Sequence, residues 1–296
     1  FAVYENGEVE INQEYSLPTI DGDLLQVIST DGLGNLSWNS IASAPFEEAA
    51  GSILPKNDSA DFKVGGKLQA GYYDDYSSKL NFDYSKSALR GGRIDEFNAN
   101  WDEDSLGESS IAYGNNTKAL GDYSQAFGYA SSAEGSASFA AGEESVAKGN
   151  SSFSAGYRSL ANTNYSIAIG DSAEALGLAS ISLGTYNDAS GDYSFSAGRA
   201  STAGGDYSVA IGFFAKAEEF GSVAIGRNSE ATSSYAYALG NLAKASGIHS
   251  FASGYATKAS GREATAMGNQ TKASGFYSVA IGSRTEALGN TSFAVG

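Results

Sequence analysis

A 14-residue period runs through the last two thirds of the chain and leaves few folds open to it. The pentapeptide SVAIG occurs three times, at 208–212, 222–226 and 278–282, and near-copies lie between and around these segments. Segments similar to SVAIG start every 14 residues from 110 to 292 without insertion, giving thirteen complete repeats and the opening of a fourteenth. Glycine fills position 5 of every copy, and alanine fills position 10 of every complete copy. A period this regular indicates a repeat architecture.

The length of the repeat selects the kind of repeat fold. Fourteen residues are too few for a pair of helices and too many for one strand. They fit a coil of two strands of about five residues and two tight turns, stacked on its neighbours in a solenoid. Glycine at position 5, and usually at position 12, indicates corners with positive φ or close approach of two backbones. At about 4.8 Å per coil, thirteen coils would make a rod about 60 Å long.

Alternation along each strand predicts which side chains face the interior of the roll. Positions 2 and 4 are bulky and apolar, so we expect them to fill the roll together with the small residue at position 10. Positions 9 and 11 collect lysine and glutamate and are expected to face water. The predicted core residues are Val209, Ile211, Ala217, Val223, Ile225, Ala231, Val279, Ile281 and Ala287.

Positions 1, 3 and 5 carry only serine, alanine or glycine in all fourteen copies. A solvated face would vary more, so we expect another backbone to pack closely there, most simply that of further copies of the chain. The alternative is a bare flat surface of the kind found on ice-binding solenoids, but those usually carry ranks of threonine, which is scattered here. The predicted trimer interface includes Ser208, Ala210, Gly212, Ser222, Ala224, Gly226, Ser278, Ala280 and Gly282.

The repeats resemble a known family. SVAIGRNSEATSSY at 222–235 and SVAIGSRTEALGNT at 278–291 are similar to head repeats of trimeric autotransporter adhesins of the YadA-like type. The resemblance covers 110–296. It implies an all-β, left-handed parallel β-roll in which three chains associate, and a role in attachment to a surface or to host matrix or glycan. It also implies an extracellular location at a bacterial surface. Similar repeats occur in phage fibres, so a virion fibre and a passive spacer stay open as alternatives.

The residues before the repeats predict two further segments. Residues 1–40 read as a short β-hairpin module, with hairpin signals at Asn6-Gly7 and at the DGLGN turn of 31–35. Residues 41–109 are expected to connect this module to the roll, and the stretch from Ser85 onward to cap the first coil, because an open strand edge invites aggregation. Gly296 lies inside a repeat, so we expect the roll to continue beyond it.

The composition argues against catalysis and against several kinds of partner. The chain has no cysteine and only one histidine, His249, which sits at the last position of a repeat where tyrosine is commonest. No GxSxG elbow or phosphate loop accompanies it, so we expect no enzyme and no cofactor. The net charge of −16 disfavours nucleic acid. No apolar run approaches the length of a membrane span.

Two further groups of residues were considered as sites. Asp74-Asp75 and Asp102-Glu103-Asp104 are carboxylate clusters, but they lack EF-hand spacing and are expected to be solvated rather than to bind metal. The segment FFAKAEEFG at 213–221 departs most from the pattern, and its Phe213, Phe214 and Phe220 are candidate ligand contacts. Stacking between neighbouring coils is the alternative role for the aromatic residues at the turns.

Overall fold

The computed structural model describes residues 106–296, residues 85–93, and nine short strands, β1–β9, nearer the amino terminus. The chain divides into two compact units, residues 1–62 and residues 63–296. The structure describes strands in both units, and no helix occurs among the described residues. The expected all-β class is therefore confirmed.

The first unit consists of antiparallel pairs. Val3 lies opposite Val9, so the predicted pairing of the strands around Asn6-Gly7 is confirmed, and Thr30 lies opposite Leu36 in the second hairpin. The strands are β1 (Ala2–Val3), β2 (Val9–Ile11) and β3 (Tyr15–Leu17) in one sheet, β4 (Gln26–Thr30) with β5 (Leu36–Ser40), and β6 (Phe46–Ala49) with β7 (Ser52–Pro55).

The second unit begins near β8 (Phe62–Gly66), inside the 41–109 segment that the sequence suggested as one connector. β9 (Ser78–Asp83) pairs antiparallel with β10 (Ala88–Arg93). β10 in turn pairs in parallel with β11 (Ile111–Asn115), with Leu89 opposite Ile111. β10 therefore covers the strand edge of the first coil.

Arg90 closes the interior of the roll at this capped end. It stands opposite Ala112, in the column that carries alanine or serine in every coil, and its side chain is buried. The nearby Lys86 ammonium donates a hydrogen bond to the Leu106 carbonyl oxygen at 2.9 Å. A long side chain is accommodated here because the cap is not a standard 14-residue coil.

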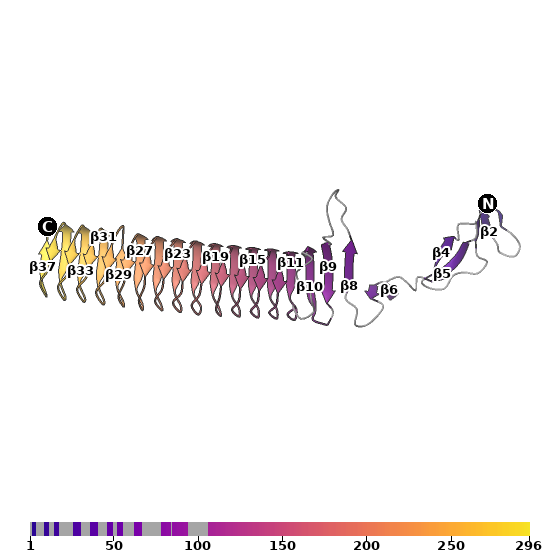
Figure 1. Cartoon of the computed structure of the whole chain (residues 1–296), viewed down its shortest axis with the longest axis horizontal. Coiled ribbons are helices and arrows are strands. Elements are labelled where there is room, and N and C mark those ends of the chain that lie inside the picture. Colours follow the sequence, from indigo (N-terminus) through magenta and orange to yellow (C-terminus); the bar gives the residue numbers. More distant parts are fainter. Residues whose placement is uncertain are drawn as a thin grey trace. The chain divides into compact units, whose positions relative to one another are not determined.

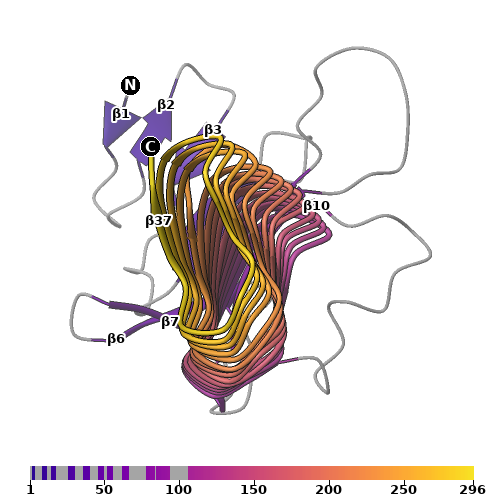
Figure 2. The same ribbon diagram turned by 90° about the vertical axis from the view of Figure 1, so that its left-hand side faces the viewer.

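The repeats form a parallel β-solenoid of thirteen complete 14-residue coils (Figure 1). Each coil has one long and one short strand, and each strand pairs in parallel and in register with the strand 14 residues later, as Val209 does with Val223. Seen end-on, the flattened coils stack with a gradual rotation (Figure 2).

The long strands form one sheet and the short strands a second. After β11, the long strands are β13 (Gln125–Tyr129), β15 (Phe139–Glu143), β17 (Phe153–Tyr157), β19 (Ile167–Asp171), β21 (Ile181–Thr185), β23 (Phe195–Arg199), β25 (Val209–Phe213), β27 (Val223–Arg227), β29 (Tyr237–Leu239), β31 (Phe251–Tyr255), β33 (Thr265–Asn269), β35 (Val279–Ser283) and β37 (Phe293–Val295). The short strands are β12 (Lys118–Ala119), β14 (Ser132–Ala133), β16 (Val146–Ala147), β18 (Leu160–Ala161), β20 (Glu174–Ala175), β22 (Asp188–Ala189), β24 (Thr202–Ala203), β26 (Lys216–Ala217), β28 (Glu230–Ala231), β30 (Lys244–Ala245), β32 (Lys258–Ala259), β34 (Lys272–Ala273) and β36 (Glu286–Ala287).

The two turns of each coil place the residues at positions 7 and 14 in the left-handed region of backbone conformation, although almost none of these residues is glycine. Tyr207 has φ 56° and Phe214 has φ 55°. A residue other than glycine in this region is destabilising by about 1–2 kcal/mol relative to the right-handed conformation. Hydrogen bonds to the preceding coil hold these turns, as when the Tyr207 amide donates to Asp192 O at 2.8 Å and the Phe214 amide to Arg199 O at 3.0 Å.

The glycines lie beside the turns and allow successive coils to approach closely. Gly212, at the end of β25, has φ 142°, and a Cβ placed on it would overlap the carbonyl oxygen of Gly226 in the next coil. A Cβ placed on Gly205, at position 12, would likewise overlap the backbone of Glu219 in the next coil. The expectation of close backbone approach is confirmed, while the corner residues themselves are at positions 7 and 14.

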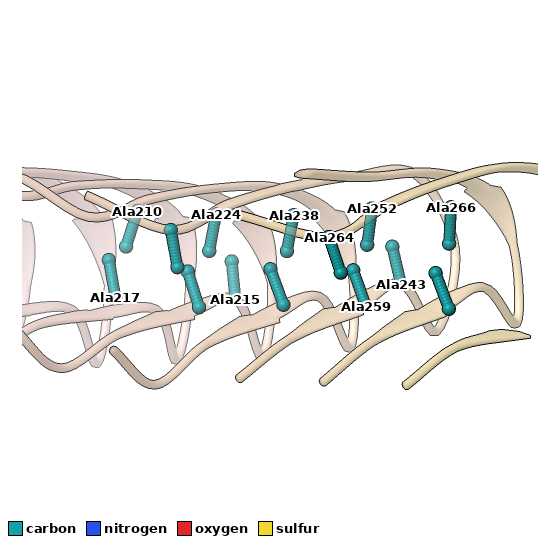
Figure 3. Close-up of a cluster of buried hydrophobic side chains, with 14 of the residues drawn as sticks. Ala210, Ala215, Ala217, Ala224, Ala238, Ala243, Ala252, Ala259, Ala264 and Ala266 are labelled. Atoms are coloured by element: carbon teal, nitrogen blue, oxygen red, sulfur yellow. The ribbon is translucent and has the colours of Figure 1, made fainter. Parts of the chain in front are cut away.

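The interior of the roll is made mainly of alanine and serine, with threonine or asparagine at position 8 of some coils, as at Thr257 and Asn187. Ala210 and Ala224 from the long strands point toward Ala215 and Ala217 from the short-strand side, and all four are completely buried (Figure 3). Where serine replaces alanine at position 3, its hydroxyl donates across the interior to a carbonyl oxygen, as Ser196 does to Ser201 O at 2.8 Å. The interior thus has room for small side chains only.

This narrow interior reverses the predicted faces of the long strand. Ser208, Ala210, Ser222, Ala224, Ser278 and Ala280 were predicted to contact other chains, but they are completely buried within their own chain. Gly212, Gly226 and Gly282 are half-buried beside the next coil. The prediction of a trimer interface on these serines and alanines is wrong, because their side chains fill the narrow interior of their own chain.

The large residues of positions 2 and 4 are correspondingly outside the roll. Val209, Ile211, Val223 and Val279 are half-buried, and Ile225 and Ile281 are exposed by 40% and 38%. Their assignment to the core is wrong, since a shift of one residue moves every side chain of a strand to the opposite face. The short-strand residues Ala217, Ala231 and Ala287 do lie in the interior.

Replacing Gly212 by alanine should destabilise the roll by about 3 kcal/mol or more, because the new Cβ meets backbone that cannot move and the φ is unfavourable. Thermal unfolding followed by circular dichroism measures this. Lys216→Ala, on the exposed face of the same coil, is the control and should shift stability by less than about 0.5 kcal/mol. Equal melting temperatures for the two variants would contradict the glycine packing described above.

Candidate interaction surfaces

The long-strand sheet presents a continuous apolar face to the outside. We define the apolar face as positions 2 and 4 of all fourteen copies; none of these residues is charged. Several are exposed in the single chain, among them Ile169 at 41%, Ile225 at 40% and Met267 at 38%. The members are Ile111, Tyr113, Gln125, Phe127, Phe139, Ala141, Phe153, Ala155, Ile167, Ile169, Ile181, Leu183, Phe195, Ala197, Val209, Ile211, Val223, Ile225, Tyr237, Leu239, Phe251, Ser253, Thr265, Met267, Val279, Ile281, Phe293 and Val295.

The regularity of the apolar face follows from the in-register pairing of the strands. Each residue sits directly above its counterpart in the neighbouring coil, so that Phe139 and Phe153, both at position 2, stack with ring centroids 4.8 Å apart. Phe127, at position 4 of the preceding coil, contacts Phe139 diagonally, with ring centroids 5.7 Å apart. Large contiguous apolar surfaces are rare on soluble monomers and mark contact with another macromolecule. The apolar face therefore has the character of an interface along the whole length of the roll.

The opposite face, formed by the short strands, is polar. Its positions 9 and 11 project outward, as expected from the sequence, and carry 12 of the 25 charged residues at 110–296. Glu230 and Lys244, adjacent in register, form an ion pair at 2.6 Å. Both partners are substantially exposed, so the pair contributes little to stability.

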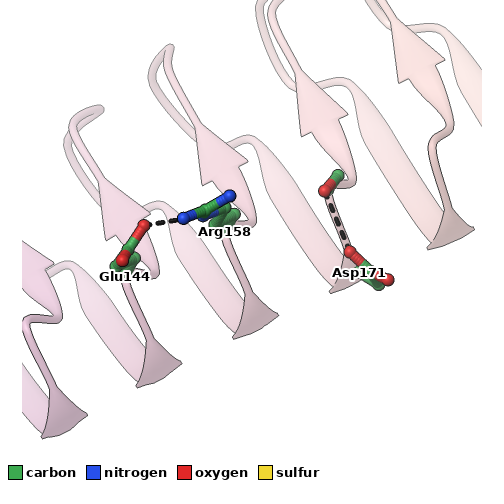
Figure 4. A network of polar contacts seen from close by, with 4 residues as sticks. Glu144, Arg158 and Asp171 are labelled. Carbon is green, nitrogen blue, oxygen red and sulfur yellow. Dashed lines mark hydrogen bonds and ion pairs between the residues drawn. The ribbon is translucent and has the colours of Figure 1, made fainter.

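A second ion pair joins neighbouring turns rather than strands. Arg158 Nε donates to a carboxylate oxygen of Glu144 at 2.7 Å, and this hydrogen bond raises the pKa of the guanidinium further above its ordinary value (Figure 4). In the next coils, the Ser172 hydroxyl donates to Asp171 Oδ1 at 2.9 Å. The first of these contacts joins two neighbouring coils, and the second lies within one coil. Both lie at the surface and form no enclosed site.

Asp188 is the one carboxylate on the short-strand face whose pKa departs clearly from the ordinary value in the described residues. Burial raises the pKa of its carboxyl group, partly offset by a hydrogen bond with the Ser190 side chain. Its Oδ1 is buried without a hydrogen-bond partner, and Glu174 stands beside it in register. The ionised form is thus disfavoured in the folded chain.

The three candidate phenylalanines do not form one site. Phe213 ends β25 and Phe214 follows it at the turn, with ring centroids 4.5 Å apart, whereas Phe220 lies at the turn before β27. Arg199 and Arg227 cover the Phe213 ring from the two neighbouring coils, at 5.6 and 5.8 Å. Only Phe214 and Phe220 are largely exposed, by 46% and 42%.

Phe220 belongs to an aromatic ladder along one row of turns. The ladder consists of Tyr193, Tyr207, Phe220, Tyr235 and His249, with neighbouring ring centroids between 5.0 and 5.4 Å apart. These contacts agree with stacking between coils, the alternative that the sequence left open. His249 is the last ring of the ladder and stacks on Tyr235.

No metal centre is assembled in the part of the chain that the structure describes. No group of three or more histidine, aspartate or glutamate residues gathers there in a way that could hold a metal ion. The carboxylates at 74–75 and 102–104 lie outside the described residues. His249 is exposed at a turn. The described residues also contain no helix long and apolar enough to cross a membrane.

The raised pKa of Asp188 predicts how stability depends on pH. A carboxyl group with a raised folded-state pKa destabilises the fold when ionised, and this cost disappears as the pH falls below its ordinary pKa of about 4. Asp188→Asn should therefore melt at a higher temperature than the wild type at pH 7, with the difference vanishing toward pH 3.5. Melting curves across this pH range measure it.

Glu286→Gln is the control for this prediction, because it makes the same charge change at an exposed position 9. It should leave the melting temperature nearly unchanged across the same pH range. A stabilisation by Asp188→Asn that did not depend on pH would contradict the assigned cause.

Comparison with known proteins gives one family. The model of the YadA head domain repeat (2 copies) matches residues 105–131, 147–173, 161–187, 189–215, 217–243, 231–257, 245–271, 259–285 and 273–296, which together are more than half of the chain. No curated protein matches the chain.

Proposed function

Because the chain belongs to the family of YadA head domain repeats, we propose that it is part of a trimeric adhesin fibre, in which three rolls associate through their apolar faces and attach the fibre to a surface outside the cell. Heads of this family are homotrimeric and belong to cell-surface or extracellular adhesins. The observation that carries the proposal is the charge-free apolar face that each single chain leaves exposed.

The energetics favour association along the entire roll. Fully burying a valine or isoleucine side chain stabilises by about 1.5–3 kcal/mol, and each coil offers two half-exposed positions. Because coils repeat in register, contacts made by one coil are repeated by the next, and small contributions add along the length. The proposed seam consists of Val209, Ile211, Val223, Ile225, Val279, Ile281 and their counterparts in the other coils.

The same arrangement leaves the short-strand sheet available for ligands. The alanine interior separates the two sheets (Figure 3). Packing on the apolar face therefore leaves the outward-facing positions 9 and 11 at the surface. Three chains then display every surface feature three times, and many weak contacts combine into firm attachment. Phe214 and Phe220 remain candidate ligand contacts at the turns.

Three charges placed on the apolar face should break the trimer. We expect wild-type protein to have about three times the chain mass of 30.5 kDa in light scattering, unchanged on dilution. The triple variant Ile211→Asp, Ile225→Asp, Ile281→Asp should dissociate toward the chain mass on dilution, because unpaired carboxylates buried in an apolar seam are strongly unfavourable.

The matched control places the same charges on the other sheet. Thr202→Asp, Thr232→Asp and Ser260→Asp change outward-facing positions of the short-strand side and should leave the trimer mass unchanged. A wild-type monomer at all concentrations would contradict the proposal, as would a triple Ile variant that keeps the full trimer mass.

A further inference from the structure

Three successive coils carry the same cationic surface on an otherwise acidic chain. The tripeptide Lys-Ala-Ser occurs at 244–246, 258–260 and 272–274, in consecutive repeats. Residues 231–285 contain five lysine or arginine residues and one glutamate, whereas the whole chain has a net charge of −16. This segment is therefore a local reversal of charge.

The fold converts this repetition into a straight row of ammonium groups. Lys244, Lys258 and Lys272, which we call the lysine ladder, stand directly opposite one another in register on β30, β32 and β34. Adjacent strands are about 4.8 Å apart, so the row carries one positive charge at each such step. Glu230 and Glu286 end the row on its two sides.

Folding alone gives no reason for the lysine ladder. Like charges directly opposite one another on neighbouring strands destabilise a sheet. Lys244 is paired with Glu230 at 2.6 Å, whereas Lys258 and Lys272 form no ion pair with any described residue. All three ammonium groups lie on the outward face, with Lys244 and Lys258 exposed and Lys272 half-exposed.

Hydroxyl groups accompany the charges on the same face. Ser246, Ser260 and Ser274 follow the lysines by two residues and therefore project to the same side of the sheet; each is at least partly exposed. A row of ammonium groups with a parallel row of hydroxyl groups offers charge-assisted and neutral hydrogen bonds to an extended anionic polymer. No aromatic residue occupies positions 9 or 11 of these coils, so stacking of nucleic-acid bases has no platform here.

We propose that the lysine ladder binds a sulfated polysaccharide laid along the roll. One coil advances by about the length of one sugar unit, and a charge at every coil matches a polymer with an anionic group on every unit. A polymer with carboxylates on alternate sugars would leave lysines unpaired. The inference rests on the proposed adhesive function and names the class of ligand; each of the three chains would carry one such site.

The test compares two triple variants with the same charge change in the full-length chain. Lys244→Gln, Lys258→Gln and Lys272→Gln remove the ladder, and Lys118→Gln, Lys148→Gln and Lys216→Gln remove isolated lysines from the same sheet face. Binding to immobilised heparin is measured at low salt and at about 0.15 M salt. The ladder variant should bind about tenfold more weakly or worse, with a shallower salt dependence, and the control variant as wild type.

Two further measurements keep the outcome unambiguous. The ladder variant should melt at the same or a higher temperature than wild type, because repulsion between the lysines is removed, which excludes unfolding as the cause of lost binding. Light scattering on the same samples reports the trimer separately, so a monomer that still binds heparin through the ladder would contradict the proposed assembly but support this site.

Equal loss of heparin binding in both variants, or no loss in either, would overturn the proposal. Hyaluronan or duplex DNA binding as tightly as heparin would also overturn it.

Discussion

The narrow interior of the coil is the constraint on which the rest of the structure depends. Two strands and two turns made from fourteen residues bring the sheets so close that short side chains fill the space between them. Most are alanine and serine, as at Ala210 and Ala217, with threonine or asparagine at position 8 of some coils. Glycine columns let neighbouring coils stack without a Cβ in the way, as at Gly212. Repeated backbone hydrogen bonds and close packing, rather than large apolar side chains, hold each chain together.

The two outer faces have different roles because of this constraint. With the interior filled by short side chains, residues such as Val209 and Ile225 project outward, where only another macromolecule can bury them. The residues of the short-strand face are polar and need no such burial. They vary along the roll, from Asp188 in one region to the lysine ladder in another. A periodic fold thus combines a uniform association surface with a second surface whose chemistry changes from coil to coil.

Much of this architecture could be predicted from the sequence, because the 14-residue period, the glycine columns and the resemblance of the repeats all point to a stacked roll. The inward and outward faces of the long strand could not. Alternation along a strand is compatible with two assignments of the inward and outward faces, shifted by one residue. The choice between them depends on the distance between the two sheets, which no local sequence pattern gives. The invariant Ala at position 10, seen at Ala217 and Ala231, was a clue that its partners across the interior must also be small. The burial of Arg90 at the cap depends on a pairing with β11 that the repeat pattern does not contain.

The central claim is that the apolar face is covered in the native assembly, and the absence of cysteine from the chain allows a direct measurement. A single cysteine is introduced either at Ile225, on the apolar face, or at Lys216, on the outward face of the short strands, and its rate of reaction with a maleimide reagent is measured under native conditions. The account predicts that the cysteine at 225 reacts much more slowly than the one at 216, and that the difference disappears in denaturant. Equal rates under native conditions would contradict it.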